Sequence, residues 1–142
     1  MTTLPPIEKI YEAWTAVADG RVELSDTNAK VSSSDGTKEY TVRFAGDTYS
    51  SNDNATFWRG YAGYPVIAVL MLQGKLPLDL DEAKKWKGIN WTSVNKKHRN
   101  NYQAAVKEIE EERGLAPEPS ATAASKVMDA LKQLPIQIKR KI

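Results

Sequence analysis

The sequence contains no cysteine and a single histidine, His98, and these absences exclude several classes of site. Without cysteine there is no disulfide, no thiolate nucleophile and no zinc or iron–sulfur site that depends on Cys. One imidazole provides no His cluster, so we expect no metal site and no cofactor. A cysteine-free chain suits a reducing compartment, and the cytoplasm is the expected location.

Long hydrophobic runs are also missing. The most apolar stretch, VIAVLML at 66–72, has seven residues, whereas a membrane span needs about 20. The N-terminal residues lack the basic patch and apolar region of a secretory signal, so neither membrane insertion nor export is expected. At 142 residues the chain fits one domain, 1–142, in which the proline-containing stretch 115–120 is a connector and not a domain boundary.

No known catalytic motif is present. The sequence has no nucleophile motif, phosphate-binding loop or dinucleotide fingerprint. His98 lies at helical spacing with apolar residues, which favours a packed role over a catalytic one. Asp79, Asp81 and Glu82 cluster where a helix begins, and exposed N–H groups attract carboxylates there. We therefore assign no catalytic residue, and these observations favour a non-enzymatic protein.

The hydrophobic pattern predicts an α+β fold that begins with a helix. Apolar residues share one arc from Pro5 to Ala18, which is typical of an amphipathic helix. From Arg21 to Gly60 short alternating runs replace this pattern, and Asp35-Gly36 is a two-residue hairpin signal. An antiparallel meander of three to five strands is expected in this region.

The remaining residues predict mainly helices. Pro65 and Gly74 bound a buried helix over 65–73, although its Val and Ile content leaves a buried strand open. Three amphipathic helices follow, over about 80–87, over about 94–113 and around 124–134. Alternation of apolar and polar residues after Pro135 predicts a C-terminal edge strand.

Basic residues are concentrated in one segment of a chain whose net charge is only +2. Between Ala83 and Val106 there are six Lys and Arg residues and no acid, while the rest of the chain has 14 basic and 18 acidic residues. Such segregation is typical of proteins that bind phosphate-bearing partners. The predicted polyanion-binding residues are Lys84, Lys85, Lys87, Lys96, Lys97 and Arg99.

The predicted helix over 94–113 places three of these cations where the helix dipole opposes them. Lys96, Lys97 and Arg99 fall in its first turns, and four glutamates lie near its other end. Each exposed mismatch of this kind costs about 0.3–1 kcal/mol. A conflict between local preference and fold indicates function, because a bound polyanion would relieve it.

Two tryptophans lie within the same segment. Trp91 and Trp86 can stack on nucleic-acid bases if they are exposed. Trp86 shares a helical arc with Leu80 and Ala83, however, which favours burial. The cations of this segment could also be a hydrated helical face with no binding role. Both interpretations, a polyanion-binding surface and a hydrated helical face, stay open.

The stretch WRGYAGYP at 58–65 is a secondary candidate ligand site. Arg59, Gly60, Tyr61 and Gly63 would let the backbone approach an anionic or planar ligand. The alternative is a tight strand-to-helix turn whose tyrosines pack against its sides.

Three functions are consistent with these observations. The leading one is a non-enzymatic, basic-faced module that binds nucleic acid or another polyanion through phosphate contacts. The alternative is a protein that forms a homodimer or binds a protein partner through Trp58 and its neighbours, or through the edge near Ile136 and Ile138. The third is a carboxylate-dependent enzyme built around residues 58–65.

Overall fold

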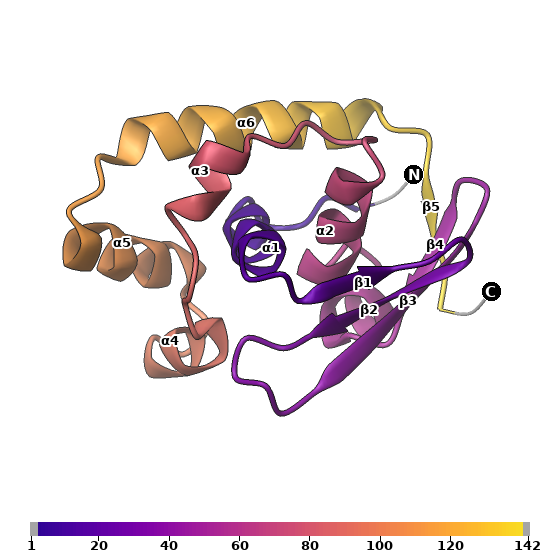
Figure 1. Ribbon diagram of the computed structural model, residues 1–142, viewed down its shortest axis with the longest axis horizontal. Coiled ribbons are helices and arrows are strands. Elements are labelled where there is room, and N and C mark those ends of the chain that lie inside the picture. Colours follow the sequence, from indigo (N-terminus) through magenta and orange to yellow (C-terminus); the bar gives the residue numbers. More distant parts are fainter. Residues whose placement is uncertain (1–2, 141–142) are drawn as a thin grey trace.

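The computed structural model describes residues 3–140, which form a sheet at one end of the molecule and helices at the other (Figure 1). The sheet has five strands in the order β1-β2-β3-β4-β5. Strands β1 to β4 are an antiparallel meander, and β5 pairs with β4 in parallel. The strands are β1 (Val22–Leu24), β2 (Asn28–Ser32), β3 (Glu39–Ala45), β4 (Thr48–Ser51) and β5 (Gln137–Ile138). The predicted α+β class, the meander and the C-terminal edge strand are confirmed.

Six α-helices and one π-helical turn complete this part of the chain. They are α1 (Glu8–Ala18), η1 (Ala55–Arg59), α2 (Tyr64–Leu72), α3 (Leu80–Lys84), α4 (Trp91–Lys97), α5 (Tyr102–Arg113) and α6 (Pro117–Gln133). The buried helix predicted over 65–73 is therefore confirmed as α2, and the alternative of a buried strand is wrong. No helix within residues 3–140 has the length and hydrophobicity to cross a membrane.

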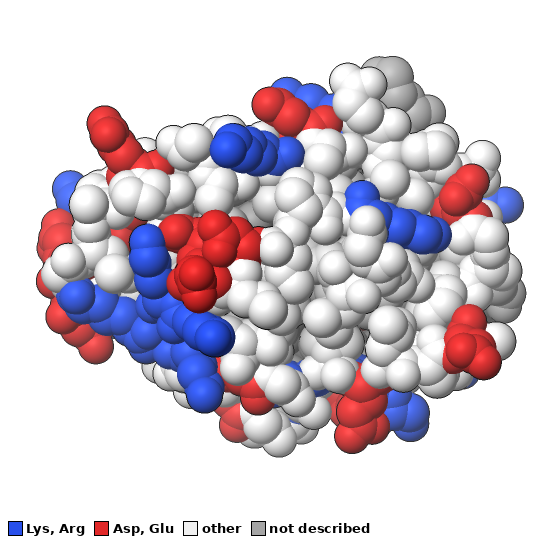
Figure 2. All heavy atoms as spheres, turned by 45° about the horizontal axis from the view of Figure 1, so that its top comes forward, with Lys and Arg blue, Asp and Glu red and all other residues white. Residues whose placement is uncertain are grey.

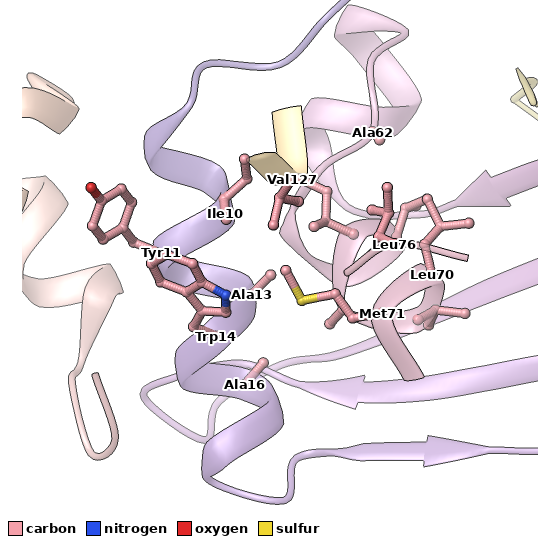
Figure 3. Close-up of a cluster of buried hydrophobic side chains, with 14 of the residues drawn as sticks. Ile10, Tyr11, Ala13, Trp14, Ala16, Ala62, Leu70, Met71, Leu76 and Val127 are labelled. Carbon is pink, nitrogen blue, oxygen red and sulfur yellow. The ribbon is translucent and has the colours of Figure 1, made fainter. Parts of the chain in front are cut away.

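Helix α1 lies at the centre of the molecule and is covered by α2, α3, α5 and α6 (Figure 1). All its side chains from Lys9 to Ala16 are buried. In the core, Ile10 and Ala13 of α1 lie on the side that faces Met71 of α2 and Val127 of α6 (Figure 3). Burying one large apolar side chain contributes about 1.5–3 kcal/mol. The packing of α1 against α2 and α6 is therefore a main source of stability.

The single helix predicted over 94–113 is wrong, because the chain breaks it into α4 and α5. Arg99 and Asn100 between them adopt left-handed backbone conformations, with φ of 53° and 63°. The side chain of Asn101 then begins α5 by accepting a hydrogen bond from the Ala104 N–H at 3.1 Å. Asparagine side chains compete with helical hydrogen bonds in this way, and Asn100 and Asn101 directly follow Arg99 at the break.

The connection between β2 and β3 also differs from the prediction. It is a six-residue loop over 33–38 and not a two-residue turn, and of its central residues only Gly36 has positive φ, at 75°. The Asp35 carboxylate accepts hydrogen bonds from the hydroxyls of Ser33 and Thr37 and from the Thr37 N–H. These three bonds explain why the pKa of Asp35 falls to about 2.

Two further local predictions are wrong. Residues 55–59 form the π-helical turn η1 instead of a strand, and its first turn is held by Asp53, whose carboxylate accepts a bond from the Thr56 N–H at 3.1 Å. Pro117 begins α6, so most of the expected connector over 115–120 is helical. Proline suits a first helical position because its missing N–H has no intrahelical partner there.

Candidate functional site

The predicted conflict between the cations and the helix dipole does not exist. Lys96 and Lys97 lie in the last turn of α4 and Arg99 lies beyond it. The C-terminal end of a helix dipole is negative and favours cations. The position of these residues therefore has an ordinary electrostatic explanation and does not itself indicate a polyanion site.

Two of the six predicted cations are neutralised by carboxylates. Lys97 Nζ lies 2.6 Å from Glu108 Oε1, and His98 Nε2 lies 3.1 Å from the same oxygen. Hydrogen bonding and charge attraction between Lys97 and Glu108 raise the pKa of the lysine and lower that of the carboxyl. Lys85 Nζ lies 2.9 Å from Glu82 Oε2. His98 is half-buried beside Glu108, so its predicted place in the packed core is only partly realised.

The other four cations are exposed, and none forms an ion pair with a residue in the range 3–140. They are Lys84, Lys87, Lys96 and Arg99. Lys and Arg side chains gather on the side of the molecule that holds α3, α4 and α5, with carboxylates next to them (Figure 2). The structure therefore leaves a surface of unpaired cations, smaller than predicted and bordered by acids.

Helix α5 connects the two groups of cations. Arg113 Nη1 donates a hydrogen bond to the Lys85 carbonyl at 2.9 Å, which joins the end of α3 to the end of α5. Lys97 contacts Glu108, five residues earlier on α5. Five residues span about 8 Å of helix axis, so the two groups flank a short length of α5.

Trp86 and Trp91 are core residues, and the prediction that they stack on bases is wrong. They are 0% and 3% exposed. Trp86 Nε1 donates to Ser120 Oγ at 3.2 Å, and Trp91 Nε1 donates to Thr15 Oγ1 at 2.8 Å. Their indoles stack on each other with ring centroids 6.2 Å apart. These contacts anchor α3 and α4 to α6 and α1.

The secondary candidate stretch forms a structural turn. Arg59 ends η1 and is exposed, and Gly60 follows with φ 74°. Tyr61 is half-buried. Gly63 is buried, and a Cβ there would lie 2.1 Å from Asp53 Oδ2. The missing side chain of Gly63 thus makes room for a carboxylate of the protein itself.

A polar cavity that the sequence did not indicate lies between α1, β3, the start of η1 and α4. Its volume is about 160 Å³. The groups that line it include Lys9, Glu12, Tyr40, Asp53, Tyr64 and Asn95. A lysine and a glutamate three residues apart on a helix ordinarily form an exposed pair, so the sequence carried no signal that they are buried.

The Lys9–Glu12 pair is buried beside this cavity. Lys9 Nζ lies 3.2 Å from Glu12 Oε2, and Asn95 Nδ2 donates to the same oxygen at 3.4 Å. Burial raises the pKa of Glu12, although Lys9 acts to lower it. Burial is the largest single influence on the pKa of Lys9 and lowers it, but the charge and hydrogen bond of Glu12, together with Tyr102 and Tyr61, outweigh it, so the net shift is upward. Buried, mutually perturbed groups at a cavity are typical of functional sites.

A groove of about 410 Å³ near the end of β4 contains two arginines. Its lining includes Arg43, Phe57 and Arg140. The Arg140 guanidinium lies 5.6 Å from the ring centroids of both Phe57 and Trp58, and Trp58 is 67% exposed. Tryptophan is among the residues enriched at protein–protein interfaces, so the exposed ring is available for contact with a partner.

Comparison with known proteins adds a family but no activity. No curated protein and no solved structure matches the chain. Within residues 3–140, no group of three or more His, Cys, Asp and Glu side chains could hold a metal ion. One family model matches residues 2–137, and the chain therefore belongs to the family described as Uncharacterised conserved protein UCP014422.

Proposed function

We propose that this protein is a cytoplasmic, non-enzymatic module that binds nucleic acid or another polyanion through phosphate contacts. One observation carries the proposal: Lys84, Lys87, Lys96 and Arg99 are exposed and without ion-pair partners in the described part of the chain, within a segment that contains no acid. Unpaired cations are the ones whose charge is available to a phosphate. This segregation of charge does not depend on the direction of any helix dipole.

Binding at such a surface is weak and independent of sequence. The four residues provide charge but no base-reading geometry, and both nearby tryptophans are buried. Non-specific phosphate contacts give dissociation constants of about 10⁻⁴–10⁻⁶ M at physiological salt. We therefore expect similar affinity for DNA sequences of equal length, and an affinity that falls as salt is added.

Fluorescence anisotropy with labelled 20-mers of single- and double-stranded DNA tests the proposal. The variant K84E/K87E/K96E/R99E should lose binding, because it replaces every unpaired cation of this surface with an acid. A control matched in charge is K38E/R43E/K126E/K139E, which makes the same change of net charge at four exposed cations outside this surface. Equal loss in both variants would show that only net charge matters and would refute a defined surface.

The exposed Trp58 favours a second candidate function, self-association or binding of a protein partner. Multi-angle light scattering of the wild type and of W58S separates this candidate from the first. A concentration-dependent dimer that W58S abolishes would support it. A wild-type protein that stays monomeric to about 100 µM would exclude any self-association stronger than about 5 kcal/mol.

A further inference from the structure

We propose that the polar cavity between α1, β3, η1 and α4 binds a small primary ammonium compound. This site is separate from the cation surface, and neither proposal depends on the other. The lining comes from segments far apart in the chain, since Glu12 lies 83 positions before Asn95. The fold therefore assembles the cavity only when α1 and α4 are docked.

The charge of the cavity favours a cation. Its lining holds one lysine, Lys9, and two carboxylates, Glu12 and Asp53. Lys9 is paired with Glu12, but no described Lys or Arg lies within ion-pair distance of Asp53. The Asp53 carboxylate accepts hydrogen bonds from the hydroxyls of Ser51 and Thr56. A ligand with one positive charge would balance the remaining negative charge.

The cavity contains an unused hydrogen-bond acceptor. Asn95 Oδ1 is buried and has no partner among the described residues. Beside it, Glu12 Oε2 accepts bonds from Lys9 and from Asn95 Nδ2. Buried polar atoms in native proteins are nearly always hydrogen-bonded. An ammonium group supplies three donors and no acceptor, which suits the unfilled Asn95 oxygen.

The walls and the size of the cavity further restrict which ligands can bind. Tyr40, Tyr64 and Trp91 contribute aromatic rings, which attract cations. A volume of 160 Å³ corresponds to about five water molecules, enough for a short-chain amine but not for a nucleotide. Asn54 and Thr92 also line the cavity and are exposed, so it opens to solvent between η1 and α4.

Titration of the full chain with ethylammonium chloride, followed by ¹⁵N NMR, tests the proposal. The reporters are the Asn95 side-chain amide and the indole N–H of Trp91. Ethanol is the neutral control of similar size, and potassium chloride controls for ionic strength. We expect saturable shifts with ethylammonium alone, with a dissociation constant of about 1–10 mM, the range for a ligand of so few atoms.

Two substitutions at one position distinguish a binding site from a merely hydrated cavity. N95L removes the unfilled acceptor and should weaken binding about tenfold or more, and N95D adds a negative charge and should strengthen it by a similar factor. The K84E/K87E/K96E/R99E variant should bind ethylammonium as the wild type does. Shifts that do not saturate by about 50 mM, equal shifts with ethanol, or unchanged affinity in folded N95D would each overturn the proposal.

Discussion

The hydroxyl of Thr15 should hold α4 against α1, and Thr15→Val tests this. Thr15 is fully buried, and its Oγ1 donates to the Trp86 carbonyl at 2.5 Å and accepts from Trp91 Nε1 at 2.8 Å. Valine has almost the same shape and the same preference in a helix. The substitution therefore removes both hydrogen bonds without opening a cavity.

The expected loss follows from the two polar groups left behind. The Trp91 N–H and the Trp86 carbonyl would stay buried without this partner, and each such group costs about 1–3 kcal/mol. Thr15→Val should therefore lower the free energy of unfolding by about 2–6 kcal/mol. Thr15→Ser keeps the hydroxyl and loses one methyl group, which costs about 1 kcal/mol.

Urea denaturation of the three proteins provides the assay. The predicted order of stability is wild type, then Thr15→Ser, then Thr15→Val, with a similar denaturant slope in each because the buried surface is unchanged. A simple hydrophobic account gives the opposite order for the two variants, since valine is the more apolar. Thr15→Val as stable as Thr15→Ser would refute the role assigned to this hydroxyl.

Two other predictions concern stability and titration. Gly63→Ala should lower the free energy of unfolding by about 1–3 kcal/mol, because the added Cβ would lie 2.1 Å from Asp53 Oδ2. Gly60→Ala places its Cβ in open space and should lose only about 1–2 kcal/mol, from the strain of a positive φ. Urea denaturation measures both losses. NMR titration should place the pKa of Asp35 at about 2, because Thr37 and its neighbours bond the charged form. This folded pKa lies below the ordinary value of 3.8. The contribution of the Asp35 carboxylate to folding stability is therefore present above pH 3.8 and is lost as pH falls toward 2. Asp35→Asn should not show this pH dependence.

Helices α1 and α2 were predictable because their local signals agree with their packing. The apolar arc from Ile7 to Val17 and the Pro65–Gly74 boundaries each identify a helix that the structure contains. The break between α4 and α5 was not predictable from periodicity, because the apolar spacing continues through His98 while the backbone turns at Arg99. The Asn101 side chain begins α5 after that turn, and the spacing of apolar residues does not reveal such a cap.

The candidate sites were also only partly predictable from the sequence. Segregated charge is visible in a sequence, so the four unpaired cations were among the six predicted. Pairing of Lys97 with Glu108 and of Lys85 with Glu82 depends on how helices end and pack, which charge counts do not reveal. The polar cavity was missed because α1 is enclosed on every side, and its polar face meets Asn95 instead of water.

The salt dependence of DNA binding tests the central claim most directly. Four phosphate contacts predict that the logarithm of the association constant falls against the logarithm of salt concentration with a slope of about −3.6 for duplex DNA. The slope should be close to zero for any binding that K84E/K87E/K96E/R99E retains. A wild-type slope near zero, or the same slope in both proteins, would contradict the assignment of phosphate contacts to these four residues.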